Sequence, residues 1–96
     1  MPWTVRLEDE RGQPVNKEYA FIDFVGSQNV RPDGLLRYLD PYGDTVFNRP
    51  QIGDFITEWR AIKPTEPTQT KEWQKVLDSA LRCEAEVHLY LRFMGD

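Results

Sequence analysis

The sequence predicts an α+β fold, in which a small antiparallel sheet carries two helices packed on one of its faces. In the first half of the chain, apolar and polar residues alternate in short stretches, which is typical of strands. After Asn48 the apolar period changes from two to 3.6, which is typical of helices. The predicted order of elements along the chain is β-β-β-β-α-α-β.

Composition places the chain among small folded proteins. A length of 96 residues suits one domain, so we expect residues 1–96 to form a single globular domain. The net charge of −4 disfavours nucleic-acid binding, because phosphate would be repelled. Cys83 is the only cysteine, which fits a reducing compartment. With neither an apolar signal core nor a membrane-length apolar run, we expect a small acidic cytoplasmic protein.

Three strands are expected before residue 40, the first two of them joined by a turn at residues 9–14. Residues 3–8 alternate strictly, with Trp3 and two further apolar residues on one side. Residues 18–25 are apolar on both sides apart from Asp23. A loop at 26–34 then leads to a third strand at 35–39.

The stretch DPYG, residues 40–43, has the residues that a type I turn prefers at its first, second and fourth positions. We expect Gly43 to take the left-handed conformation that closes a three-residue hairpin between strands 35–39 and 44–48. The alternative is a small ligand or metal site at Asp40 and Asp44. Turn chemistry alone accounts for both aspartates, so the structural interpretation is favoured.

Two helices follow. Asn48 is the expected N-cap of the first, and Gly53 is expected to delay its firm start to Asp54. Its apolar stripe comprises Ile52, Phe55, Ile56, Trp59 and Ile62. The second helix is expected at residues 71–84 with Thr70 as its cap.

Residues 87–93 alternate and are assigned to a final strand, although Val87, Leu91 and Met94 also fit a helical spacing. Two helices with one apolar stripe each can cover only one face of a sheet. The other face is therefore expected to carry aromatic and charged side chains. They are Arg6, Tyr19, Phe21, Asp23, Arg37, Tyr90 and Arg92.

Few residues suggest catalysis. His88 is the only histidine, and it does not share a helix face with Cys83, which we expect to be a buried thiol. Ser27 and Ser79 are the serines available to it. Asp23 is the one carboxylate whose position suggests desolvation, and we expect Arg6 or Arg37 to pair with it. We name no catalytic residue, metal ligand or cofactor, and the residues favour a non-enzymatic role.

The sequence therefore predicts a protein–protein interaction module that uses the uncovered sheet face to bind a protein partner or a second copy. The candidate contact residues are Arg6, Tyr19, Phe21, Arg37, Tyr90 and Arg92. One alternative is single-stranded nucleic-acid binding on the same face, where aromatic side chains could stack on bases. The other is a carboxylate-based enzyme that uses Asp23, Asp40 or Asp44.

Overall fold

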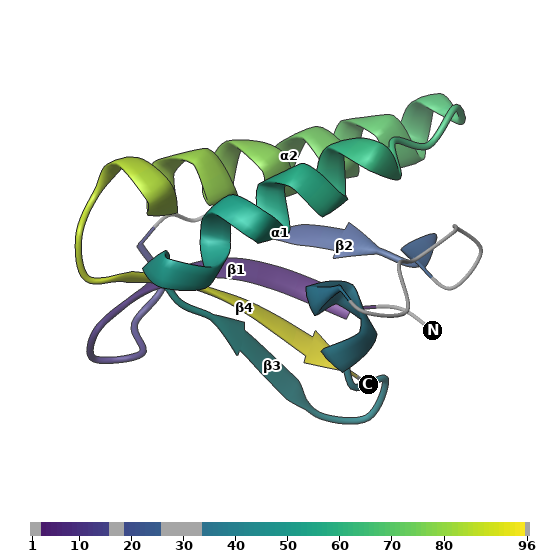
Figure 1. Cartoon of the computed structure of the whole chain (residues 1–96). Helices are drawn as coiled ribbons and strands as arrows, with labels where there is room; N and C mark the ends of the chain where they lie inside the picture. The colour runs from purple at the N-terminus through teal and green to yellow at the C-terminus, as the bar shows by residue number, and fades with distance from the viewer. Residues whose placement is uncertain (1–2, 16–18, 26–33, 96) are drawn as a thin grey trace.

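The computed structural model describes residues 3–15, 19–25 and 34–95. Figure 1 shows two helices lying over one face of a four-stranded antiparallel sheet, so the predicted fold class is confirmed. The spatial order of the strands is β2-β1-β4-β3. Their bounds are β1 Trp3–Asp9, β2 Ala20–Ile22, β3 Asp44–Phe47 and β4 Leu89–Gly95.

The central pair of strands, β1 and β4, joins the two ends of the chain. Trp3 lies opposite Gly95, and the pairing continues in register to Asp9 opposite Leu89. The alternation at residues 87–93 therefore does mark a strand, but one that begins at Leu89. His88, just before it, has a φ of 64°, a left-handed conformation that is unusual for a residue other than glycine.

The expected strand at 35–39 is wrong. Leu35–Tyr38 forms a short 3₁₀-helix, η2, because a carboxylate from a distant part of the chain binds its first N–H groups. Glu58 Oε2 accepts from Leu35 N at 2.8 Å, and Glu58 Oε1 accepts from Leu36 N at 3.3 Å. Donors held in this way satisfy the start of a helix and are not available to a strand ladder.

The DPYG turn is present, but it joins η2 to β3 and not two strands. Asp40 O accepts from Gly43 N at 3.4 Å, and Asp40 Oδ1 accepts from Tyr42 N at 2.9 Å. The expected left-handed Gly43 is wrong, because among the described glycines only Gly12 has a positive φ. A turn held by the Asp40 side chain does not require that conformation.

The second strand is shorter than expected. Only Ala20–Ile22 pairs with β1, whereas Phe24 and Val25 are buried beyond the end of the strand. The expected strand start at residue 18 and most of the expected loop at 26–34, including Ser27, lie outside the described residues.

Helix α1, Arg49–Ala61, begins directly after its predicted cap. Asn48 Oδ1 accepts from Gln51 N at 3.2 Å, and Gln51 Oε1 accepts from Asn48 N at 2.9 Å. This reciprocal capping box satisfies two N–H groups that would otherwise lack partners. It holds the first turn although Gly53 is within the helix, so the expected delay to Asp54 is wrong.

Helix α2, Pro67–Ala85, starts earlier than expected, with Glu66 and not Thr70 as its cap. The Glu66 carboxylate accepts from Thr68 N at 3.0 Å and from Gln69 N at 3.2 Å. The hydrogen bond from Thr68 is the main cause that lowers the pKa of Glu66. Thr70 lies inside the first turn, and its hydroxyl donates to the Pro64 and Glu66 carbonyls.

The hydrophobic core lies between the helices and the sheet. Its largest side chains form one aromatic cluster, with ring centroids 5.1 to 6.1 Å apart. The members are Phe24, Phe47, Phe55, Trp59 and Phe93. The cluster draws on β3, β4, α1 and the segment after β2, so it fixes which face of the sheet is buried.

Candidate functional site

The sheet face that points away from α1 and α2 is the candidate site, here called the outer face. In Figure 1, neither helix lies over this face. Strand alternation and register place Arg6 opposite Arg92, Glu8 opposite Tyr90, and Thr4 between Phe21 and Met94. Asp44 and Val46 of β3 complete the face.

A network of four charged residues occupies the middle of the outer face. Glu8 is only 1% exposed, although no described helix covers it. Its Oε1 accepts from Arg92 Nε at 2.8 Å, and its Oε2 accepts from Arg6 Nε. Arg92 Nη1 also donates to Asp44 Oδ2 at 2.8 Å. We call Arg6, Glu8, Arg92 and Asp44 the Glu8 network; its two positive and two negative charges balance.

The network explains how two arginines can lie directly opposite each other in the sheet. Like charges in cross-strand pairs destabilise a sheet, and Glu8 offsets this by binding both guanidinium groups. The hydrogen bond to Glu8 raises the pKa of Arg6 and of Arg92 above the ordinary value of a guanidinium group. Both arginines are therefore charged and engaged within the protein.

Aromatic side chains surround this network. Phe21 on β2 is 61% exposed, whereas Tyr90 on β4 is half-buried. Tyr19, just before β2, is also half-buried and contributes to the raised pKa of Arg6. Of the predicted contact residues, the structure therefore brings Arg6, Phe21, Tyr90 and Arg92 together on the outer face, with Tyr19 beside them.

Two residues do not match their expected places. Arg37 lies on η2, outside the sheet, and its guanidinium is 4.6 Å from the centroid of the Tyr38 ring. Asp23 is exposed, so the expectation that it is desolvated is wrong, and Arg6 pairs with Glu8 instead. Sequence reasoning missed the burial of Glu8, because one of its two arginine partners, Arg92, is 84 residues away.

The aspartates of the DPYGD stretch have structural partners. The Asp40 carbonyl accepts from Trp3 Nε1 at 3.0 Å, in addition to its contacts within the turn. Asp44 binds Arg92. Gly43 O accepts from Gly95 N at 2.7 Å, which fastens the turn to the end of β4. Turn and sheet contacts thus account for both carboxylates, in agreement with the structural interpretation.

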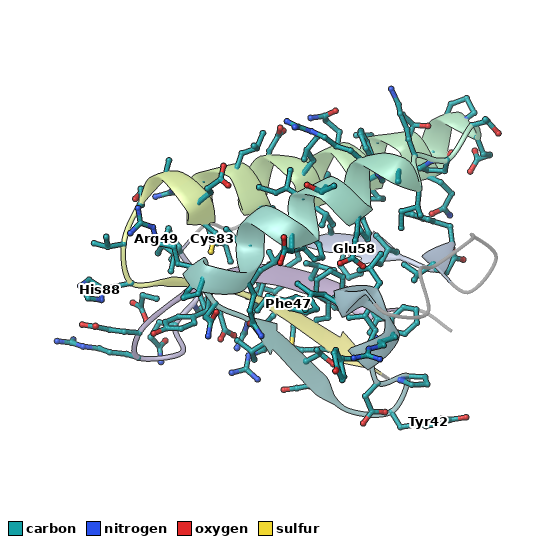
Figure 2. The ribbon with its side chains drawn as sticks, viewed as in Figure 1. Tyr42, Phe47, Arg49, Glu58, Cys83 and His88 are labelled. Carbon is teal, nitrogen blue, oxygen red and sulfur yellow. The ribbon has the colours of Figure 1, made fainter. Side chains whose placement is uncertain are left out.

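Cys83 and His88 lie in different environments, one buried and the other exposed. Cys83 is fully buried on the inner side of α2 and its Sγ donates to Leu89 O at 3.3 Å, whereas the His88 side chain is 70% exposed (Figure 2). Burial raises the pKa of Cys83 to about 11, so the thiol is protonated at neutral pH. His88 Nδ1 lies 3.3 Å from Glu10 Oε2. This arrangement offers no activated nucleophile.

Residues 3–15, 19–25 and 34–95 contain neither a metal-binding cluster nor a membrane-spanning helix. Within those ranges, no three His, Cys, Asp or Glu side chains gather so that they could hold a metal ion. No helix in them is both long and apolar enough to span a bilayer. Comparisons with family models, curated proteins and solved structures find no match.

Proposed function

We propose that this chain is a protein-binding module that docks a protein partner on the outer face of its sheet. The observation that carries the proposal is Phe21, a large aromatic side chain left 61% exposed on the same sheet face as a half-buried tyrosine and two arginines. Aromatic residues and arginine are the types enriched at interface cores and hot spots. Such a face favours a partner that covers Phe21 with apolar side chains and excludes water from the Glu8 network.

The Glu8 network also indicates how salt should affect binding. Its four charges are already paired within the chain, so a partner need not neutralise them. We therefore expect binding that depends mainly on apolar burial and weakens little as salt is added. This behaviour separates protein docking from phosphate binding, which weakens steeply with salt.

The two alternatives have less support. Single-stranded nucleic acid would need arginines available for phosphate, but Arg6 and Arg92 are both bound to Glu8. A carboxylate-based enzyme would need a concave site that holds acidic groups. One shallow groove in the described part of the chain runs along α2 and contains none of Asp23, Asp40 and Asp44. It is lined by Pro67, Thr70, Lys71, Gln74, Lys75 and Asp78.

The test compares two substitutions of similarly exposed apolar residues. Phe21→Asp places a charge on the outer face, and Val87→Asp places one before β4, where Val87 is 57% exposed. Immobilised wild type and Val87→Asp should retain the same protein from a native extract, also at high salt, whereas Phe21→Asp should lose it. Retention by Phe21→Asp, or salt-sensitive binding of single-stranded RNA by the wild type, would contradict the proposal.

A further inference from the structure

The two edges of the sheet differ in how their backbone groups are satisfied. At the β2 edge, Phe21 N–H points away from β1 and donates to Glu72 Oε1 at 3.0 Å. Glu72 is itself held by Lys75 at 2.9 Å. A side chain of α2 therefore closes this edge, which is one way in which proteins protect an edge strand from pairing.

The β3 edge has no such closure. The hydrogen bond from Gly95 N to Gly43 O fixes the alternation of the antiparallel ladder, so Thr45 and Phe47 bond toward β4. The N–H and C=O groups of Asp44 and Val46 must then point outward. Across the described ranges, no hydrogen bond reaches these four groups. Figure 1 shows β3 at the margin of the sheet, and no described helix or strand lies beyond it.

Exposed apolar surface gathers at the same edge. Within the described ranges, six large hydrophobic side chains are exposed, and three of them lie in the chain segment 38–46. Tyr38 is 56% exposed, Tyr42 is 76% exposed and Val46 is 40% exposed. Figure 2 shows Tyr42 projecting from the turn that leads into β3. Such surface would be removed from water if another strand were added here.

We propose that β3 pairs in antiparallel fashion with β3 of a second copy of this chain. A two-fold axis between the two Thr45 residues would place Asp44 of each copy opposite Val46 of the other. Each such pair exchanges two N–H···O=C bonds, so the open groups on both copies would be satisfied by four hydrogen bonds. The two sheets would then form one continuous sheet of eight strands.

The occupant is a second copy because the edge is complementary to itself. The two open residues are separated by one residue, which is the spacing that a two-fold axis requires. Asp44 would not repel its counterpart strongly, because Arg92 already binds its carboxylate. A strand pair of this length buries less than the roughly 800 Å² per partner of a standard interface, so we expect a dimer that dissociates on dilution. Since Glu72 closes the β2 edge, assembly should stop at two copies.

Sedimentation velocity of the purified chain, from low-micromolar to millimolar concentration, tests this dimer. We expect the mass to rise from one copy to two and no further. Val46→Pro removes an N–H that β4 does not use, and it should weaken the dimer at least roughly tenfold through the loss of two hydrogen bonds. Val46→Thr is the matched control, since it keeps the N–H and the branched shape, and it should still dimerise.

Amide hydrogen exchange provides a second readout that does not depend on the proline variant folding. The amides of Asp44 and Val46 should exchange fast in dilute wild type and slowly at high concentration. A wild type that stays monomeric throughout would overturn the proposal, and would leave a strand from a different protein as the occupant of the edge. A dimer abolished by Phe21→Asp but not by Val46→Pro would also overturn it. The edge dimer and the docking proposed for the outer face can therefore fail separately.

Discussion

Trp59 and Trp73 link helices α1 and α2 through two reciprocal hydrogen bonds. Trp59 Nε1 on α1 donates to the Trp73 carbonyl at 3.0 Å, and Trp73 Nε1 on α2 donates to the Trp59 carbonyl at 2.9 Å. Both side chains are buried. Because each indole bonds to the backbone of the other helix, the pair sets the relative position of the helices above the sheet.

Replacing Trp73 with Phe should therefore destabilise the protein by about 1–3 kcal/mol, through the lost hydrogen bond and the smaller ring. Denaturant unfolding measures this change. The control is Lys63→Ala, which removes only a cation 5.3 Å from the Trp73 ring centroid and should cost less than about 1 kcal/mol. Equal effects of the two substitutions would contradict a structural role for the reciprocal bonds.

Gly34 precedes η2 at a point where the chain touches a buried carboxylate. A Cβ at this position would overlap Glu58 Oε1, so Gly34→Ala should cost about 1–3 kcal/mol. Gly53→Ala on α1 is the matched control, because a Cβ there would meet Glu84 Oε2 only at 3.6 Å, an ordinary contact distance. It should stabilise the helix by about 0.5–1 kcal/mol. Thermal or denaturant unfolding of both variants checks the opposite signs.

Several elements could be predicted because their signals are local, although the Glu66 cap of α2, which is also local, was missed. The cap at Asn48 and the apolar stripe after it lie within α1 itself, and the alternation in β1 and β4 follows from their own residues. The segment 35–39 could not be assigned in this way. Its five residues suit a short strand, and Glu58, which makes it a 3₁₀-helix, comes 22 residues after Leu36.

In the candidate site, too, some features follow from local sequence patterns and others depend on distant residues. Alternation alone placed Arg6, Phe21, Tyr90 and Arg92 on one sheet face, which the strand register bears out. Alternation could not show that Glu8 is buried there, because burial depends on side chains from β1 and β4 that meet only in the folded sheet. The role of this face in binding remains a prediction.

The buried position of Glu8 predicts unequal effects for the two acids of the Glu8 network. Glu8→Gln leaves Arg6 and Arg92 opposite each other without the charge that binds both, and it should cost about 1–3 kcal/mol. This range allows for screening of the two partly exposed arginines. Asp44→Asn removes an acid whose side chain is 50% exposed, and it should cost less than about 1 kcal/mol. Denaturant unfolding that gives the reverse order would contradict this account of the network.

The raised pKa of Cys83 predicts how the free energy of unfolding changes with pH. Burial raises its folded-state pKa from 9.0 to about 11, so above pH 9 the unfolded chain loses this proton more readily than the folded protein. The stability contributed by the buried thiol is therefore full below pH 9 and falls as the pH rises toward 11. Relative to Cys83→Ala, the wild type should lose about 2–3 kcal/mol over that interval. A constant difference between the two unfolding curves would contradict the raised pKa.

Hydroxyl-radical footprinting tests the central claim, that the outer face is bare in the isolated chain and covered by a partner when it functions. The reaction is read at Phe21 and at Val87, which are similarly exposed. We predict that Phe21 is oxidised readily in the purified protein and becomes protected when the protein is returned to its native extract, while Val87 is oxidised in both. Equal oxidation of Phe21 in both conditions, or its protection in the purified protein, would contradict the claim.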